Sequence, residues 1–486
     1  MSTRKRTLIF GLFSSTALAT FAALGLVACG DDDPGAARPG FDSPDAAPDV
    51  VANLPETSTP GDGGTDADAG PQRDPFDPAD EPVTCAATGP CAKQLVAGAN
   101  HFCALMSDGS VRCWGDDEYG ALGGGLPPKG DPTPKGAPEG DAGATTLVDG
   151  LTDATQISAG GQTTCARRAD GSVYCWGKND QGQLGLDDVA PQWDYDAHPA
   201  PSQVAVRDPA VRVDVGPDNV CAVLSTGKVS CWGNNEKMQL ARPDAEPAYV
   251  LGPALAELDP FAISRITIGS ATIFGITNAG GLVDWGEIAG RDGLLGGRMT
   301  SISPDPTPNA ISQLSNVTSM VASVTTFGPG GGGFPPKPPI RLGHACAIAG
   351  GEVYCWGRSN LGALCTGLMD EELLPTPSPI DSKAWPQQLA VGKEVTCARM
   401  TDGSIQCCGG ADKGRLGTGQ TEPFSTFFTP IASFEGHAVQ VATSDFAVCA
   451  LVKDGTVECW GSNSYGELAM GTRDDDPHPT PVKIAF

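Results

Sequence analysis

Short runs in which apolar and polar residues alternate recur along the chain from about residue 92 onwards. In one copy, residues 102–106 and 110–114 form two such runs on either side of Asp108-Gly109. Alternation with a period of two is typical of a half-buried strand, and an Asp-Gly turn joins two strands into a hairpin. Each copy continues with a segment of the form W-G-x-N-x-x-G-x-L-G, clearest at 176–185, and a further short run with Pro and Val, such as 479–486, closes the unit. The pattern predicts a repeating unit of three to four strands.

Seven copies of this unit follow one another. Their first hairpin strands place equivalent positions at 103, 165, 221, 274, 346, 397 and 449, so the period ranges from 51 to 72 residues. A sheet of three or four strands cannot cover its own faces, whereas seven such sheets packed radially bury both faces and leave only short edges. A linear β-solenoid, the second possibility, requires a much shorter period. We therefore expect an all-β fold, a seven-bladed β-propeller over residues 81–486.

The repeat resembles the regulator-of-chromosome-condensation repeat family, whose unit combines a G-x-x-H-T segment, a D-G turn, an aromatic-rich W-G and an N-x-x-G-Q-L-G tail. His101 and His344 stand where the family has its His, and we expect both to be structural residues with local hydrogen bonds. The resemblance extends over residues 92–486 and implies the seven-bladed fold. It leaves the function open, because the family includes nucleotide-exchange factors, a β-lactamase inhibitor and many uncharacterised modules, and function resides in sites grafted on a fold.

The N-terminal residues indicate the compartment. Three basic residues at 4–6 precede an almost uncharged apolar run over residues 7–28. That run is long enough to span a membrane, but its flanks favour a secretory signal peptide. Its end, Leu-Val-Ala-Cys at 26–29, resembles the lipobox of bacterial lipoproteins. The resemblance implies that residues 1–28 are removed and that Cys29 becomes the lipid-modified N-terminus; a cleaved signal with an incidental Cys is the alternative.

Residues 29–80 are predicted to form a disordered acidic tether. Residues 30–80 contain twelve Asp and one Glu against two Arg, and they are nearly free of large apolar side chains. Such a segment cannot bury enough apolar surface to offset the entropy lost on ordering, and its like charges extend it. The expected location is therefore the bacterial cell envelope, with the chain lipid-anchored on the periplasmic or outer surface.

The cysteines follow the repeat. Six copies carry Cys at two slots nine or ten residues apart, whereas the copy near residue 274 has Phe274 and Asp284 there and lacks both. The hairpin turn places the two slots opposite each other on neighbouring strands, close enough for a disulfide. We expect six cross-strand disulfides: Cys103–Cys113, Cys165–Cys175, Cys221–Cys231, Cys346–Cys355, Cys397–Cys407 and Cys449–Cys459.

Four further cysteines lie outside these slots. Cys85 and Cys91 enclose a small loop and are expected to pair. Cys365 replaces a tail Gly of one copy, and Cys408 replaces the repeat Trp of the next. These two replacements suggest a disulfide between two blades, but the sequence does not decide whether the two cysteines pair. The periodic cysteines already have partners and no C-x-x-C occurs, so we expect no metal site.

Composition and motifs exclude several classes of function. The chain has 486 residues and a net charge of −27, which argues against nucleic-acid partners because those are bound by clustered Lys and Arg. We find no G-x-S-x-G, H-E-x-x-H or G-x-x-x-x-G-K-[ST] motif. The expectation is a monomeric protein with no catalytic residues and no cofactor, not an enzyme.

Function is expected in the longest segments between blades. Insertions fall between the L-G tail and the next blade's first strand, at 124–143, 187–203, 303–339, 366–385 and 420–436. Long loops on a rigid scaffold are favoured places for binding residues, and aromatic side chains are favoured anchors. The candidate binding residues in these segments are Trp193, Tyr195, Phe334, Trp385, Phe424, Phe427 and Phe428. Six of the eight Trp occupy one repeat slot, for which we expect packing between blades.

The leading hypothesis is a membrane-anchored, extracytoplasmic propeller that binds a protein or an envelope polymer through loops on one face. Two alternatives remain open: an inhibitor of a secreted or periplasmic hydrolase, and an enzyme acting on envelope glycans from the central channel. The sequence does not identify the partner.

Overall fold

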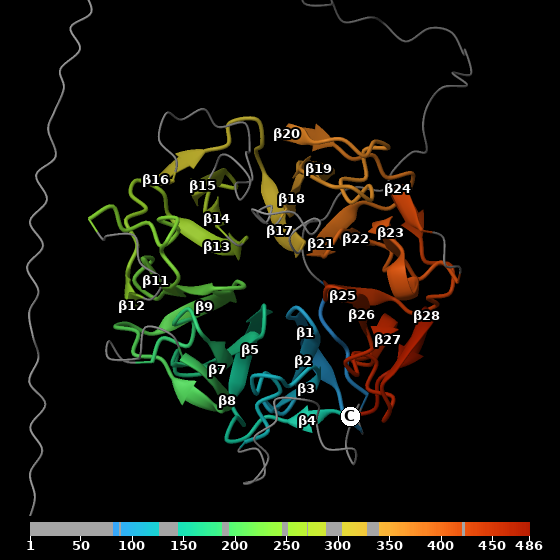
Figure 1. Ribbon diagram of the computed structural model, residues 1–486, viewed down its shortest axis with the longest axis horizontal. Coiled ribbons are helices and arrows are strands. Elements are labelled where there is room, and N and C mark those ends of the chain that lie inside the picture. The colour runs from blue at the N-terminus through green and yellow to red at the C-terminus, as the bar shows by residue number, and fades with distance from the viewer. Residues whose placement is uncertain are drawn as a thin grey trace, which may run out of the picture. The chain divides into compact units, whose positions relative to one another are not determined.

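The computed structural model describes residues 81–86, 89–125, 144–186, 194–244, 251–269, 271–287, 304–327, 340–419 and 423–486. These residues form seven antiparallel sheets of four strands each, arranged as the blades of a ring around a central channel (Figure 1). The prediction of a seven-bladed β-propeller is confirmed. Cys29, the signal segment and the tether lie outside the described residues. Within the described ranges the chain has no α-helix with the length and hydropathy of a membrane span.

In every blade the strands follow the chain from the channel to the outside. The first three blades are β1 (Ala92–Ala97), β2 (His101–Met106), β3 (Val111–Gly115), β4 (Thr146–Leu147); β5 (Ala154–Gly160), β6 (Thr163–Arg168), β7 (Val173–Asn179), β8 (Asp194–Gln203); and β9 (Ala210–Val215), β10 (Asn219–Leu224), β11 (Val229–Gly233), β12 (Leu251–Leu255). The fourth and fifth are β13 (Ile263–Ile268), β14 (Thr272–Thr277), β15 (Leu282–Gly286), β16 (Asp305–Ala310); and β17 (Val317–Phe327), β18 (Ile340–Ala349), β19 (Glu352–Gly357), β20 (Glu372–Pro377).

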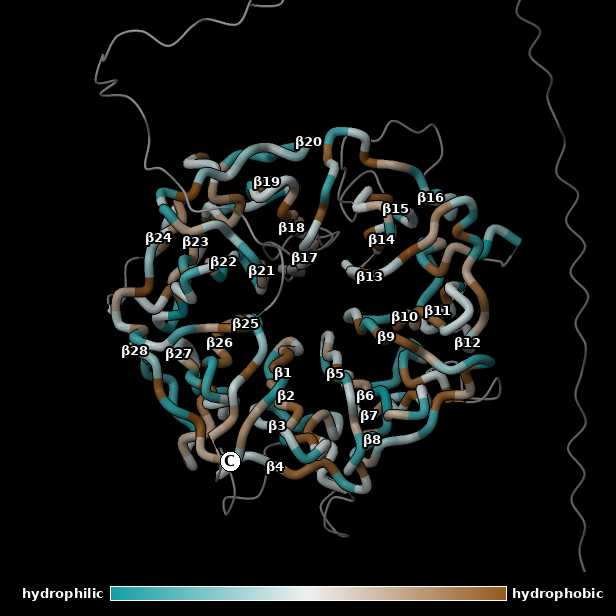
Figure 2. Tube along the Cα trace, turned by 180° about the vertical axis from the view of Figure 1, so that it is seen from behind, coloured by the Kyte–Doolittle hydropathy of each residue, from teal (hydrophilic) through white to brown (hydrophobic). Residues whose placement is uncertain are grey.

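The last two blades complete the ring. They are β21 (Pro386–Gly392), β22 (Val395–Met400), β23 (Ile405–Gly410), β24 (Phe424–Pro430); and β25 (Ala438–Thr443), β26 (Ala447–Val452), β27 (Val457–Asn463), β28 (Asp474–Lys483). A short 3-10 turn, Asp412–Gly414, follows β23. Coloured by hydropathy, the trace shows hydrophobic and hydrophilic stretches mixed within each blade (Figure 2).

The hairpin register places the repeat cysteines opposite each other. Cys103 faces Cys113 across β2 and β3, and Cys346 faces Cys355 in the fifth blade, where the spacing is one residue shorter. All six predicted cross-strand disulfides are present, with Cα atoms 4.0–4.1 Å apart, and Cys85 pairs with Cys91. In the fourth blade Phe274 faces Asp284 at the same level.

The structure also contains a disulfide between Cys365 and Cys408, the pair that the sequence left open. In the first, second and sixth blades a Gly at the position of Cys365 lies against the repeat Trp of the next blade: a Cβ atom on Gly123 would be 2.8 Å from the indole nitrogen of Trp176. Cys365 has a φ of 54°, which matches the positive φ of those glycines. Gly and Trp are thus replaced together by two cysteines that join the fifth and sixth blades covalently.

The antiparallel order gives the ring two distinct faces. Connections from first to second strand and from third to fourth strand emerge on one face, which we call the long-loop face. Second-to-third turns and the connections between blades emerge on the other, the turn face.

The structure corrects the prediction that the five insertions are loops at one repeat-equivalent position. Segment 187–203 ends in strand β8, and segments 366–385 and 420–436 contain β20 and β24, so these parts are outer strands of blades rather than loops. Segment 303–339 contains β16 and also β17, the first strand of the fifth blade. The extra length there therefore includes the connection between β17 and β18, which is not the repeat position that we expected for all insertions. Pro-rich outer strands do not show simple alternation, so they resemble loops in the sequence.

Neighbouring blades are joined by a recurring hydrogen bond of the repeat Trp. The indole nitrogen of Trp176 donates to the carbonyl oxygen of Ala121 in the preceding blade, at 2.9 Å, and Trp232 does the same to Gln183. Trp114, Trp285 and Trp460 make equivalent bonds. This confirms that the Trp slot serves packing between blades.

The ring closes without sharing a strand between its ends. Trp114 of the first blade donates to the carbonyl oxygen of Glu467 in the seventh blade, at 2.9 Å, and the Ala92 amide donates to Gly455, also at 2.9 Å. Residues ahead of β1 extend this contact, because Glu81 accepts a hydrogen bond from the Lys453 ammonium at 2.6 Å. The seam between the last and first blades therefore repeats the contacts made between the other blades.

Candidate functional site

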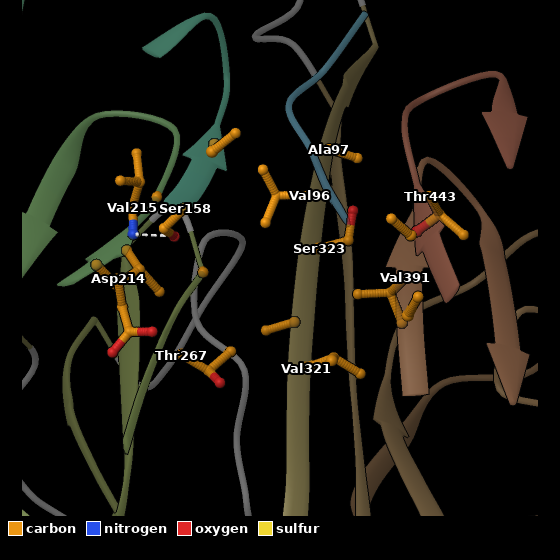
Figure 3. A pocket seen from close by; sticks show the side chains of 18 of the residues that line it. Val96, Ala97, Ser158, Asp214, Val215, Thr267, Val321, Ser323, Val391 and Thr443 are labelled. Atoms are coloured by element: carbon orange, nitrogen blue, oxygen red, sulfur yellow. Dashed lines mark hydrogen bonds between the residues drawn. The ribbon is translucent and has the colours of Figure 1, made fainter. Parts of the chain in front are cut away.

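The central channel holds a cavity of about 450 Å³ lined by the first strands of all seven blades. Most lining side chains are small, as Figure 3 shows for Ala97, Ser158 and Thr443. The Ser158 hydroxyl accepts a hydrogen bond from the Val215 amide of the next blade at 3.0 Å, the dashed line in Figure 3. The channel wall is thus held together by contacts between adjacent first strands.

Glutamine side chains make the most regular of these contacts. Gln156 on β5 donates to the carbonyl oxygen of Val213 on β9 at 2.6 Å and accepts from the amide of the same residue at 2.9 Å. Gln94 and Gln388 bind the next blade in the same two-bond manner, at Ile157 and Val441. We call these contacts the glutamine clamps.

Charged groups replace the clamp in the third blade. Arg212 donates from Nε to both carboxylate oxygens of Asp214, at 2.8 and 2.9 Å. Asp214 in turn accepts a hydrogen bond from the amide of Ile266 on the fourth blade at 3.3 Å. The Asp214 carboxylate thus accepts hydrogen bonds from the Arg212 guanidinium and from a backbone amide of the next blade. This ion pair lines the channel and also joins the third blade to the fourth.

Asp445, at the channel wall of the seventh blade, carries the most perturbed carboxyl of the cavity. Burial raises its pKa to about 6, and the neighbouring charges of Lys393 and Arg415 oppose that rise. A carboxyl with such a pKa is suited to proton transfer when a reacting partner lies beside it. Within the described residues, however, no three His, Cys, Asp or Glu side chains come together as a metal site would require.

Several predicted binding residues are distributed over different parts of the propeller. Trp193 and Phe334 lie outside the described residues. Tyr195 is exposed on β8, and Phe424 and Phe427 are exposed on β24. Trp385 lies in the connection between the fifth and sixth blades, at the turn face, where its amide bonds the Thr401 hydroxyl. The structure therefore does not gather the five described residues of this set into one surface.

Phe428 needs a separate correction, because it is only 8% exposed and packs into a hydrophobic core with Leu364 and Met400. Successive residues of a strand point to opposite faces. Phe427 therefore points outward on β24 while Phe428 points into the core.

The sequence reasoning missed four exposed aliphatic residues beside the exposed phenylalanines. Leu368 and Met369 follow Cys365 in the connection between β19 and β20, and Leu373 and Leu374 lie on β20. Together with Phe424 and Phe427 they form what we call the rim patch. The signal in the sequence is the pair of adjacent aliphatic dipeptides in segment 366–385, which a search for aromatic anchors passes over.

The histidines have structural contacts. His101 is fully buried, and its Nε2 lies 2.8 Å from the Thr164 hydroxyl of the next blade; His344 makes the same contact with Thr396 at 2.9 Å. Burial lowers the pKa of each to about 4. Both histidines are therefore structural, as expected, although their bonds join two blades rather than staying local.

Comparison with known proteins agrees with this architecture. Models of the regulator of chromosome condensation (RCC1) repeat match residues 92–121, 154–183, 210–239 and 438–467, and a second model of that repeat matches 170–223. These matches fall on the hairpins and tails of the first, second, third and seventh blades.

Relatives and solved structures extend the likeness. The ultraviolet-B receptor UVR8 of Arabidopsis thaliana is 26% identical over 402 residues, which cover 81% of this chain and 82% of the receptor. The regulator of chromosome condensation of Mus musculus is 26% identical over 355 residues, covering 70% of this chain and 78% of the mouse protein. The structure of yeast RCC1 (Prp20), solved with Kap60 bound, superimposes with a TM-score of 0.60 at 15% identity, covering 83% of this chain and 89% of the yeast chain.

Proposed function

We propose that this chain, a seven-bladed propeller built of regulator-of-chromosome-condensation repeats, is a lipid-anchored scaffold of the bacterial cell envelope that binds a partner protein. Cys29 is the proposed site of the lipid, and the proposed location is the periplasmic or outer surface of the membrane. The propeller itself acts as a binder and not as an enzyme.

The disulfide network is the observation that carries the proposal. All sixteen cysteines from Cys85 to Cys459 are joined in eight disulfides. Disulfides persist in oxidising compartments, including the bacterial periplasm and the cell surface, and are rare in the reduced cytosol. A disulfide in nearly every blade is what a protein that works outside the cytoplasm would carry.

Relatives support the binding part of the proposal. UVR8 is an ultraviolet-B receptor, and the yeast RCC1 structure was solved with Kap60 bound. A closed ring with a small-residue channel and one exposed apolar rim offers surface for recognition, which a partner protein in the envelope would use.

The anchor is tested by labelling the full-length chain in its host with an alkyne fatty-acid analogue and by fractionating the cells. Wild type should carry the label and sediment with membranes, whereas Cys29→Ser should lose the label and become soluble. The double variant Cys85→Ser/Cys91→Ser, which also removes cysteines but retains Cys29, is the matched control and should keep both. Label retained by Cys29→Ser would refute the anchor.

The compartment and the binding role have their own readouts. Alkylation of the native protein without reduction should modify no cysteine between 85 and 459, and free thiols at those positions would contradict an oxidising location. Chemical crosslinking in intact cells, followed by purification of the tagged chain, should give a reproducible protein adduct. The absence of any adduct would contradict the binding function, and stoichiometric inhibition of a co-purified hydrolase would favour the inhibitor alternative.

A further inference from the structure

The exposed large apolar side chains of the described residues are concentrated at one part of the rim. The six residues of the rim patch, each 38–55% exposed, are half of the twelve such side chains. The other six are scattered over the first, second, third and seventh blades. Single exposed apolar residues are ordinary, but a contiguous group of them marks an interaction site.

Contacts between two blades bring one part of the rim patch, the segment that leads into Leu368, against Phe427 of the sixth blade. The Gly367 amide donates to the Thr426 carbonyl oxygen on β24 at 2.9 Å. Gly367 lies so close to the ring of Phe427 that a side chain there would overlap it. The segment that carries Leu368 and Met369 therefore rests on β24. The outer strands β20 and β24 belong to adjacent blades in Figure 1.

The base of the rim patch is rigid. Cys365, two residues before Gly367, forms the disulfide with Cys408, and Cys408 lies on β23, which pairs with β24. The two halves of the patch are thus covalently joined through the only disulfide between blades among the described residues. A surface that is ordered before binding loses less conformational entropy on association.

The charges beside the rim patch indicate the chemistry of the partner. Asp370, Glu371 and Glu372 separate its two apolar pairs, the first two of them are exposed, and the chain as a whole has a net charge of −27. Arg358 pairs with Glu371 at 2.6 Å, and the exposed Asp370 carboxylate beside this pair adds a negative charge to the edge of the patch. Complementary charge steers association and suppresses wrong partners. A basic border on the partner fits this edge.

The same charges disfavour two other occupants. A second copy would bring acidic rim to acidic rim, and an anionic lipid surface would repel these carboxylates. The described chain also begins at the turn face, where Ala92 bonds Gly455, whereas Leu368 and Met369 lie at the long-loop face. The patch therefore faces away from the side at which the chain joins the ring.

Pro375 and Pro377 interrupt the edge of β20, so side-chain contact is favoured over the addition of a strand.

We propose that the rim patch of the fifth and sixth blades is the docking surface for a partner protein that presents apolar side chains bordered by Lys or Arg. This inference rests on the proposed binding function and assigns it a place on the propeller and a partner chemistry.

The test uses the full-length chain in its host, with the photocrosslinking residue p-benzoylphenylalanine placed at Leu374. The matched control carries the same residue at Leu255, an exposed apolar position on β12 in the third blade. We expect a protein adduct from position 374 that position 255 does not give. Peptide mapping of the adduct should place Lys or Arg next to apolar residues at the crosslinked site.

Two substitutions decide whether the patch makes the contact. Phe427→Ser should reduce the adduct at 374 at least tenfold, and Asp370→Lys should reduce it several-fold, whereas Val211→Ser on the third blade should leave it unchanged. Thermal unfolding of each variant reports whether the fold is retained, and Leu373→Ser, on the other half of the patch, serves if Phe427→Ser fails to fold.

Several outcomes would overturn the inference. A partner adduct that is unchanged in Phe427→Ser and Leu373→Ser would exclude the rim patch as the docking surface. The proposed binding function would then still stand. An adduct between two copies of this chain, or flotation of the Cys29→Ser protein with phosphatidylglycerol vesicles that Phe427→Ser abolishes, would assign the patch to a different occupant. If neither position 374 nor chemical crosslinking gives any protein adduct, the proposed binding function fails together with the inference.

Discussion

The two buried histidines show how one residue couples blade packing to pH. His101 and His344 each contact a threonine hydroxyl of the next blade, and burial lowers both pKa values to about 4. The neutral ring is therefore the form that the folded state accepts. In the unfolded chain a histidine has a pKa of about 6.5. Between these values the unfolded state binds protons that the folded state does not, so stability falls as pH drops from about 6.5 towards 4.

Replacing both histidines should remove this part of the pH dependence. The variant His101→Asn/His344→Asn uses the residue that Asn219 places at the same slot in the third blade. Between pH 7 and pH 4.5 each histidine should cost wild type about 2–3 kcal/mol of unfolding free energy, which the variant does not lose. Urea unfolding followed by Trp fluorescence at both pH values measures the difference. An equal pH slope in the two proteins would contradict the assignment.

Cys365 and Cys408 illustrate a paired replacement at the residue scale. A Gly with positive φ and a Trp that donates to the preceding blade are both absent, and a disulfide occupies their place. The Ala363 carbonyl oxygen, which would accept from a Trp, accepts instead from the Thr396 hydroxyl at 2.7 Å. The covalent bond thus substitutes for the packing and hydrogen bond of the repeat.

Two double variants test that equivalence. Cys365→Ser/Cys408→Ser should lower the unfolding free energy by about 2–4 kcal/mol, the typical contribution of a disulfide. Cys365→Gly/Cys408→Trp should recover most of the loss, because Gly adopts the positive φ freely and the indole regains an acceptor. Denaturant unfolding under non-reducing conditions gives both values. If the Gly/Trp protein is no more stable than the Ser/Ser protein, the equivalence is wrong.

At the scale of the strand, the glutamine clamps hold adjacent first strands together without a shared sheet. First strands of neighbouring blades are not hydrogen-bonded partners in any sheet, so their inward-facing amides and carbonyls need other partners. Gln156 supplies both partners for Val213 with one side chain. The side-chain amide of Gln156 thus takes the place of the backbone N–H and C=O groups that a neighbouring strand would supply in a continuous sheet.

Gln156→Ala should leave the Val213 amide and carbonyl unsatisfied and cost about 1–3 kcal/mol of unfolding free energy. Hydrogen exchange of the Val213 amide should accelerate in the folded protein. Thr155→Ala on the same strand, whose exposed hydroxyl donates to Arg167, is the control and should change stability by less than about 0.5 kcal/mol. Unchanged exchange at Val213 in Gln156→Ala would show that the clamp is not needed.

At the scale of the whole ring, the seam between the seventh and first blades determines closure. The seam repeats the internal blade contacts, but one residue differs: Glu467 stands where Gln183 and Gln239 stand in other blades. Burial, with the nearby Asp116 carboxylate, raises the pKa of Glu467 to about 7, although backbone N–H groups oppose the rise. The folded state therefore favours the protonated acid. The contribution of protonated Glu467 to the free energy of unfolding is complete below about pH 4.5 and is lost as pH rises through 7.

Glu467→Gln should therefore stabilise the ring at alkaline pH only. At pH 8 the gain should be about 3 kcal/mol, because the buried charge is removed while the amide still accepts from the Tyr465 amide as the carboxylate does. At pH 4.5 the variant and wild type should be equally stable. Glu435→Gln, at an exposed residue in the connection between the sixth and seventh blades, is the control for charge alone. A gain that does not depend on pH would exclude the buried carboxyl as its cause.

The sequence predicted some parts of this molecule well for a physical reason. The partner of Cys103 is ten residues away across a three-residue turn, so hairpin geometry alone places it. The repeat count and the Trp slot follow from the same short-range periodicity. Gln156 and Val213 lie 57 residues apart and meet only because two blades pack at a particular angle, and no local pattern specifies that angle.

The rim patch and the outer strands were missed for related reasons. Outer strands such as β20 and β24 are half-exposed and Pro-rich, so their sequences lack the alternation of the inner strands. Gly367 and Phe427 come together only because the fifth and sixth blades are neighbours. The two sides of Phe427-Phe428 could be assigned only after the pairing of β24 with β23 was known.

The sequence alone therefore determined what is local: seven repeats, the hairpins within them and the cysteines that face each other across each turn, because strand pairing and turn length act over a few residues. Tertiary structure decided what lies between blades: the Cys365–Cys408 bridge, the glutamine clamps, the Glu467 seam and the rim patch. Those features depend on how rigid sheets rotate and pack around a ring, and side chains from distant parts of the chain become neighbours only when that packing is complete.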